Sequence, residues 1–157
     1  MDLETYHCSV NPATGLFEFY SEGPKGRIKK VVNYQELQSG ISGMPAYNLC
    51  FGDWDEDTGD IRDRRVTNNR DMGKILATVA STVVSFTDVR GPCMIYGEGS
   101  TASRTRLYQM CINANWEQVS RLFFVSGQFR DKWEPFRQGR NYDALLVMKR
   151  LALAAAS

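Results

Sequence analysis

The hydrophobic period of the chain changes near residue 70, and this change constrains the fold more than any other feature. Before it, short runs of alternating apolar and polar residues are separated by turn residues, a pattern typical of strands. After it, apolar side chains recur at helical spacing, at Met72, Ile75, Leu76, Val79, Ala80, Val83 and Val84. Strands followed by helices that alternate with further strands predict an α+β fold with a mixed, mostly antiparallel sheet.

The first part of the chain is expected to form short antiparallel strands. They span residues 5–10, 16–20, 27–34, 47–54 and 61–67. Turns rich in glycine, proline and asparagine separate the first three strands. Residues 35–45 are interpreted as a linker because glycine and serine surround Ile41, and residues 55–60 are interpreted as an acidic turn.

The second part is expected to hold two main helices. The first begins at an asparagine cap, Asn68 or Asn69, and stops at Gly91, and the second covers residues 101–115. Further strands are expected at residues 93–96, 119–125 and 142–148, with a polar loop at residues 127–140. The strands that flank the first helix, residues 61–67 and 93–96, are expected to be parallel neighbours through a right-handed crossover.

The length of 157 residues and the lack of repeats or low-complexity linkers indicate one domain, residues 1–150, followed by a short tail at residues 151–157. The net charge of +1 excludes a global basic field that would attract nucleic acid or membrane. A local patch of Lys25, Arg27, Lys29 and Lys30 leaves nucleic acid as a weak alternative, against that of a lysine-protected edge strand. Without a charged-then-apolar leader or a long apolar span, a cytoplasmic protein with no membrane contact is expected.

The residues that commonly hold metals are sparse. The four cysteines, Cys8, Cys50, Cys93 and Cys111, lack zinc-site spacing and are expected to be free thiols, and one histidine, His7, excludes a histidine-based triad. Residues 53–60 resemble a calcium loop, but the glycine comes one place late and Arg64 replaces the bidentate glutamate. No metal is therefore expected, and a charged turn is preferred.

The segment from Gly97 to Tyr108 is the first candidate anion site. An apolar strand leads into a glycine and hydroxyl turn with Ser100 and Thr101, and a helix follows, so that free backbone N–H groups favour an anion. Arg104 and Arg106 lie in the first turns of this helix, where the helix dipole disfavours cations. A bound phosphate, a partner carboxylate or a structural link to Glu98 would each offset that cost.

The second candidate anion site lies at the start of the first helix. Arg70 and Lys74 would place positive charge beside the free N–H groups of Met72 and Gly73, where a pyrophosphate could dock. The alternative is an ordinary helix start with solvated basic side chains.

Several blocks, residues 21–26, 47–53, 67–71, 76–80 and 99–108, resemble an uncharacterised family of small bacterial proteins. A more distant resemblance is to the GNAT acyltransferase superfamily. Arg70, Asp71, Met72 and Gly73 match the first half of its pyrophosphate turn, and Leu107 with Tyr108 matches part of its helix signature. Ile75 departs from the small residue that ends the turn, and the usual two helices after the first strand are missing.

The GNAT resemblance implies a GNAT-like α+β domain that binds coenzyme A, with acetyl-CoA as the cofactor of an N-acyltransferase. In that mechanism a base takes a proton from an amine, and an acid protonates the leaving thiolate. Tyr108 matches the acid, and Asp63 is the candidate base. The diphosphate would meet the N–H groups of Met72 and Gly73, beside Arg70 and Lys74.

A non-enzymatic interaction module is the alternative function. It would be a subunit of a bacterial toxin–antitoxin or phage-defence system that binds a partner protein or nucleic acid. Arg104 and Arg106 would then face a partner carboxylate or phosphate. The incomplete pyrophosphate turn and the absence of a clear acid–base pair favour this alternative. The strand and helix order implies a GNAT-like core more strongly than it implies acetyl transfer.

Overall fold

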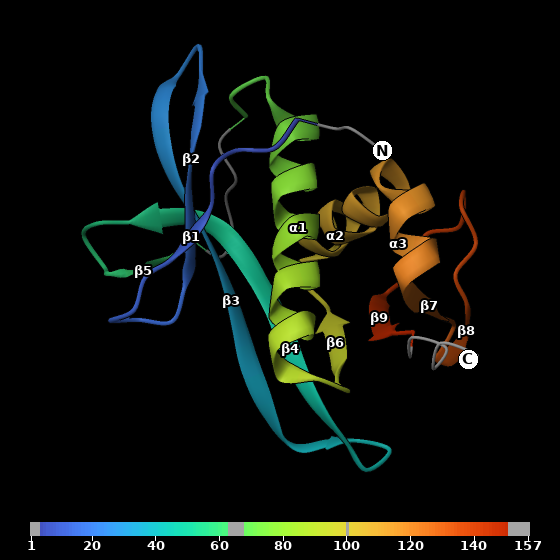
Figure 1. Cartoon of the computed structure of the whole chain (residues 1–157). Helices are drawn as coiled ribbons and strands as arrows, with labels where there is room; N and C mark the ends of the chain where they lie inside the picture. Colours follow the sequence, from blue (N-terminus) through green and yellow to red (C-terminus); the bar gives the residue numbers. More distant parts are fainter. Residues whose placement is uncertain (1–3, 63–67, 100, 151–157) are drawn as a thin grey trace, which may run out of the picture.

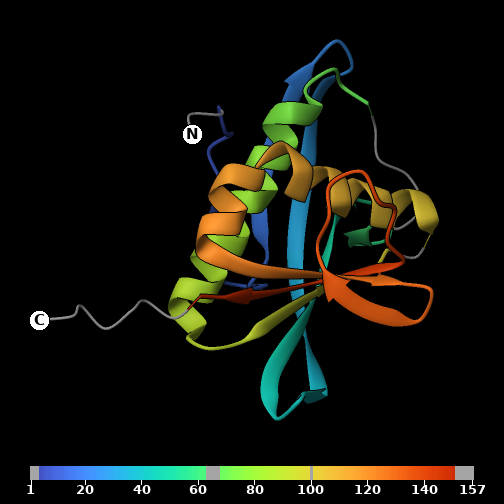
Figure 2. The same cartoon turned by 90° about the vertical axis from the view of Figure 1, so that its right-hand side faces the viewer.

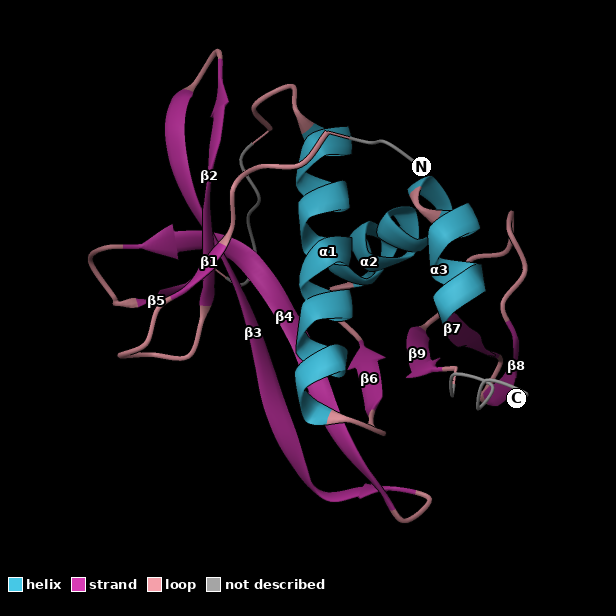
Figure 3. Cartoon of the chain, in the orientation of Figure 1, coloured by secondary structure: helices cyan, strands magenta, loops and turns pink. Residues whose placement is uncertain are grey.

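The computed structural model describes residues 4–62, 68–99 and 101–150, and it has an α+β fold. Its described part forms a nine-stranded, mostly antiparallel open sheet with three helices (Figures 1 and 3). The strand order is β1-β2-β3-β4-β6-β9-β7-β8, and β5 pairs with β4. The predicted α+β class with a mixed, mostly antiparallel sheet is thus confirmed, and the described part has one helix more than the two expected. The GNAT-like form of this fold stays a prediction.

Turn residues of the sequence separate many of the strands. Their bounds are Ser9–Val10 (β1), Phe17–Gly23 (β2), Gly26–Ile41 (β3), Met44–Asp55 (β4), Asp60–Ile61 (β5), Met94–Gly97 (β6), Phe123–Phe129 (β7), Lys132–Pro135 (β8) and Ala144–Lys149 (β9). The helices are Met72–Arg90 (α1), Ala102–Ala114 (α2) and Trp116–Leu122 (α3).

The predicted linker at residues 35–45 is instead the far end of a long β3–β4 hairpin. Ile41 pairs with Met44, so only Ser42 and Gly43 form the loop, and both have positive φ angles of 51° and 78°. Two positive φ angles in a two-residue loop are the geometry of the tight turns that match strand twist. The Ser-Gly pair therefore marked a hairpin rather than a linker.

A similar turn lies inside the predicted polar loop at residues 127–140. Phe129 pairs with Lys132, and Arg130 and Asp131 between them have φ angles of 50° and 64°. Neither residue is glycine, so the usual signal of such a turn is missing from the sequence. The loop prediction was wrong for the residues of β7 and β8.

The third helix occupies the start of the predicted strand at residues 119–125. Trp116, Val119 and Leu122 recur at helical spacing and pack against the core, and Glu117 forms an ion pair with Arg121 one turn later. The strand prediction holds only from Phe123 onward, because the apolar run continues there with strand alternation.

The parallel pair of the sheet consists of β4 and β6. They pair from Ala46 with Met94 to Asn48 with Tyr96. The prediction that residues 61–67 would be the parallel neighbour of β6 was wrong. Residue 61 belongs to β5, which pairs antiparallel with β4. Residues 63–67 lie outside the described residues. Instead, β4 is the parallel neighbour of β6, because this long strand pairs with β3 along one edge and with β6 along the other.

The core lies between the sheet and the helices. Figures 1 and 2 show α1 running along the β3–β4 hairpin, whereas α3 lies over β7 and β9. The described part includes one helix, α1, whose length and apolar composition would suffice to cross a membrane. Here Ile75 and Val79 are fully buried and pack in the core cluster with Phe51 and Val32.

Candidate anion site at the carboxyl edge of the parallel strands

β4 and β6 run parallel, and α2 directly follows β6. The carboxyl ends of these two strands therefore point the same way, whereas β5 and residues 62–71 stand between β4 and α1 in the chain (Figure 3). The strands separate beyond Asn48 and Tyr96, while β4 continues to Asp55. Between the pairings with β6 and with β5, residues 49–52 of β4 therefore have a backbone edge that neither strand pairs.

Arg104 from α2 fills part of this edge. The side chain is 4% exposed, and its Nη2 donates to the carbonyl oxygen of Phe51 on β4. The guanidinium also lies 5.7 Å from the centre of the Phe51 ring. Nε and Nη1 have no hydrogen-bond partner among the described residues. A buried charge without a counterion is costly, so this guanidinium is well suited to receive an anion.

The link between Arg104 and Glu98, one of the alternatives left open by the sequence, does not form. Glu98 instead accepts from the hydroxyl of Tyr96. The pKa of Tyr96 is raised to about 12, mainly because the hydroxyl is buried and also because it donates to this carboxylate. Within the part of the chain that the structure describes, no carboxylate lies within ion-pair distance of Arg104.

The turn between β6 and α2 holds Arg104 tightly. Thr101 caps α2 by accepting from the backbone N–H of Arg104 at 3.2 Å. The N–H of Gly99 donates to Oγ1 of Thr105 at 2.9 Å, and a Cβ on Gly99 would come within 2.2 Å of Cβ of Arg104. Only glycine fits this approach. Ser100, also predicted to bind an anion, lies outside the described residues.

Arg106 lies on a different side of α2 and is exposed. It lines a polar cavity of about 380 Å³ beside the first turn of α2. The other wall is formed by Asn141, Tyr142 and Asp143. Arg104 and Arg106 thus do not converge on one ligand, which their spacing of two residues already indicated.

Tyr108, the predicted acid, lies one helical turn after Arg104. It is buried, and its ring centre is 5.6 Å from that of Phe51. Arg104 and Tyr108 therefore contact the same residue of β4 from one face of α2. Asp63, the predicted base, lies outside the described residues.

The start of α1 is more crowded than the sequence indicated. Asp71, rather than Asn68 or Asn69, is the N-cap, and its side chain makes no capping bond. Its carboxylate accepts instead from Tyr6, at 2.6 Å, and from Ser21. This negative charge lies beside the free N–H groups of Met72 and Gly73, where it opposes a second anion.

The two predicted basic residues at this end have different surroundings. Lys74 lies 4.2 Å from the centre of the Tyr6 ring, and the Tyr6 N–H donates to Thr78. Arg70 is exposed, with a φ of 59°, and Gly73 has open space where a Cβ would be. Of the two predicted sites, the start of α2 therefore has the stronger electrostatic case.

Asn69 has a role that sequence reasoning missed. It is buried and ties the β2–β3 turn to the start of α1. Its amide nitrogen donates to the Gly26 carbonyl at 2.9 Å, and its amide oxygen accepts from the Lys25 N–H at 2.8 Å. The sequence predicted the β2–β3 turn, but nothing in it identified Asn69 as the hydrogen-bond partner of the backbone of this turn.

The predicted basic patch is dispersed. Lys30 is fully buried and forms an ion pair with Asp53, its register partner on β4. Lys29 pairs with Glu18 at 3.2 Å, and Arg27 lies over the Tyr20 ring at 4.0 Å. The interpretation of Lys30 as a surface lysine was wrong, because β3 points it into the core beside a carboxylate.

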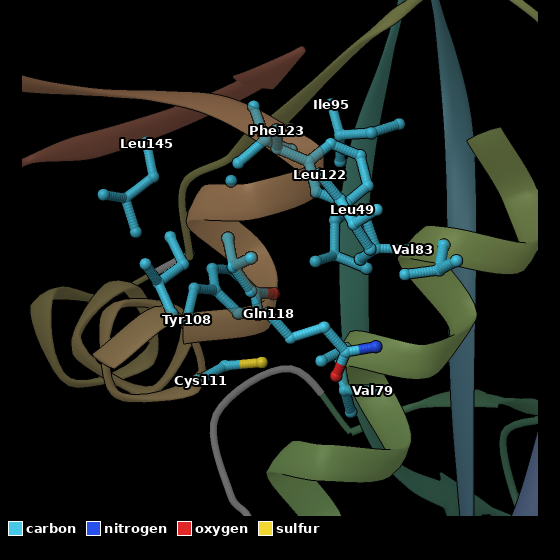
Figure 4. A pocket seen from close by; sticks show the side chains of 16 residues that line it. Leu49, Val79, Val83, Ile95, Tyr108, Cys111, Gln118, Leu122, Phe123 and Leu145 are labelled. Atoms are coloured by element: carbon cyan, nitrogen blue, oxygen red, sulfur yellow. The ribbon is translucent and has the colours of Figure 1, made fainter. Parts of the chain in front are cut away.

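An apolar cavity of about 60 Å³ lies behind Tyr108, between the helices and the sheet (Figure 4). Cys111 contributes its thiol to the wall and donates to the Leu76 carbonyl at 3.2 Å. Burial raises the pKa of this thiol to about 12. All four cysteines are free, as the sequence predicted.

Comparison with known proteins places the chain in a family. The family of unknown function DUF6934 matches residues 2–150, and the chain belongs to it. No curated protein and no solved structure shows a significant match. The resemblance to an uncharacterised family is thus confirmed, and its members share a sequence pattern without an assigned activity.

Proposed function

We propose that this protein binds a small phosphate-bearing ligand at the carboxyl edge of β4 and β6, and that Arg104 is the residue that receives its anionic group. The observation that carries the proposal is the buried guanidinium of Arg104, whose Nε and Nη1 have no partner among the described residues. An arginine donates strong, charge-assisted hydrogen bonds to phosphate oxygens. The first turn of α2 would add the positive end of the helix dipole.

Coenzyme A is the specific ligand that the GNAT resemblance favours. The order β4, α1, β6, α2 and the parallel pairing of β4 with β6 support it. The diphosphate would contact Met72 and Gly73 at the start of α1, where Arg70 and Lys74 would have to offset the negative charge of Asp71. Tyr108 would then serve as the acid of an N-acyltransferase, and Asp63 as its base.

A thermal-shift panel tests the proposal in the wild-type protein. The panel contains sodium phosphate, pyrophosphate, coenzyme A, acetyl-CoA and ATP, with sodium sulfate and sodium chloride as ionic-strength controls. Ligand at ten times its Kd stabilises the native state by about 1.4 kcal/mol, which for a chain of this size raises Tm by about 3–5 °C. The proposal fails if every phosphate compound leaves Tm within the range of the chloride control at millimolar concentration.

The panel also separates the enzyme from the interaction module. A shift with coenzyme A or acetyl-CoA that exceeds the shift with pyrophosphate supports the acyltransferase. Equal shifts for phosphate, pyrophosphate and ATP indicate a general phosphate receptor. If the protein purified from cytoplasmic extract of its host carries a stoichiometric protein or RNA but no coenzyme A, the interaction module is supported instead.

A further inference from the structure

The apolar cavity behind Tyr108 is not used by the proposed anion site. Its walls are almost entirely carbon and come from both layers of the fold (Figure 4). Leu49 and Ile95 contribute from the sheet, Val79 and Val83 from α1, and Leu122 from α3. Well-packed cores contain few voids larger than a water molecule, so a cavity of about 60 Å³ needs an explanation.

We propose that this cavity binds the end of a short aliphatic chain, and that the polar end of the same ligand lies at Gln118. The inference rests on the size, the lining and the mouth of the cavity, and it does not depend on the anion site at Arg104.

The size favours a few carbon atoms. A dry cavity of about 150 Å³ in an engineered core binds benzene or xenon. The cavity here is less than half as large, which suits a xenon atom or a chain of about three carbons and excludes an aromatic ring. Water is disfavoured because a buried water needs two to four polar partners, and these walls are carbon.

The mouth lies between α1 and α3. Val83 and Val84 on α1 and Val119 and Leu122 on α3 are only partly buried, so the cavity reaches the surface there. Gln118 is exposed, and Figure 4 shows its side chain extending toward Val79 of α1. Its amide has no hydrogen-bond partner in the described part of the chain, and it could donate to or accept from a hydroxyl, amide or carbonyl group.

Wild-type protein alone can test the size argument by NMR titration. Xenon is expected to cause saturable shifts of the methyl groups of Val79, Val83 and Leu122. In a series from ethanol to 1-hexanol, affinity should rise about fourfold for each added methylene until the cavity is full, near three or four carbons, and then level. No saturable xenon shift, or an even rise through 1-hexanol, would overturn the proposal.

Three variants locate the site. Ala80→Leu fills the cavity and should abolish xenon binding, whereas Ser81→Leu adds the same bulk on the exposed face of α1 and should leave it unchanged. Gln118→Ala should retain xenon but weaken 1-propanol by about fivefold, the effect of one hydrogen bond. Equal xenon affinity in Ala80→Leu and Ser81→Leu would contradict the assignment, and unchanged propanol affinity in Gln118→Ala would remove the role of Gln118.

Discussion

At the scale of single residues, Arg104 combines deep burial with incomplete hydrogen bonding among the described residues. It is almost fully buried and donates to one backbone carbonyl, while two of its nitrogens have no partner there. A structural arginine of this kind would be expected to pair with a carboxylate, since breaking a buried ion pair costs about 3–5 kcal/mol. This environment is the observation on which the proposed anion receptor rests.

Replacement of Arg104 by methionine tests this distinction. Methionine is similar in length to the aliphatic part of arginine and has no charge. The stability gained by removing a buried charge should therefore offset the hydrogen bond lost to the Phe51 carbonyl. We expect the unfolding free energy in phosphate-free buffer to stay within about 1 kcal/mol of wild type. Urea denaturation measures it, and Arg106→Met, at an exposed site, should change it by less than about 0.5 kcal/mol. A loss above about 3 kcal/mol for Arg104→Met would instead show a structural role.

Because the thiol of Cys111 is buried, we expect the folded protein to lose stability at alkaline pH. Its pKa rises from 9.0 to about 12 in the folded protein because the group is buried. The unfolded state therefore loses its proton first as the pH rises above 9, and stability falls between pH 9 and 12. At pH 10 this one group should cost about 1 kcal/mol relative to pH 8. Urea denaturation at both pH values should show a smaller loss in Cys111→Ala, and an equal loss in both proteins would refute the assignment.

At the scale of elements, the sequence predicted the strand-rich start, α1 and α2, but it misplaced the two tight hairpins. Ser42-Gly43 and Arg130-Asp131 are two-residue turns with positive φ angles, and the second contains no glycine to signal it. α3 was missed because its seven residues continue directly into β7, so two periods merge within one apolar run. Local pattern alone cannot separate elements that join without a turn.

Two glycines at the helix starts should respond in opposite ways to alanine. Gly99→Ala places a Cβ within 2.2 Å of Cβ of Arg104 and should lower stability by about 1–3 kcal/mol, because backbone must move. Gly73→Ala meets nothing within 4 Å and should raise stability by about 0.5 kcal/mol through helix propensity. Thermal unfolding of both variants checks the signs. A stable Gly99→Ala protein would mean that the β6–α2 turn is looser than described.

The Gly73→Ala variant also separates the two candidate anion sites. If the diphosphate of coenzyme A contacts the first turn of α1, the added methyl group should weaken coenzyme A without affecting phosphate. If the anion binds only at Arg104, Gly73→Ala should bind both ligands as wild type does. Isothermal titration of this stable variant with coenzyme A and with phosphate distinguishes the outcomes.

At the scale of the whole molecule, the parallel pairing of β4 with β6 positions the candidate site. It directs the chain from β6 into α2, and it leaves residues 49–52 of β4, between the pairings with β6 and β5, open to Arg104. The sequence identified the anion-binding residue types on both helices. It could not show that Asp71, Tyr6 and Ser21 would occupy the start of α1, because these contacts join segments far apart in the chain.

The most direct test of the account is isothermal titration of pyrophosphate into wild type, Arg104→Met and Arg106→Met under identical buffer conditions. We predict saturable binding to wild type, loss of at least tenfold in affinity for Arg104→Met, equivalent to about 1.4 kcal/mol, and a smaller change for Arg106→Met. Urea denaturation of the same samples confirms that each variant is folded. Equal pyrophosphate affinity in wild type and folded Arg104→Met would contradict the claim that Arg104 is the anion receptor.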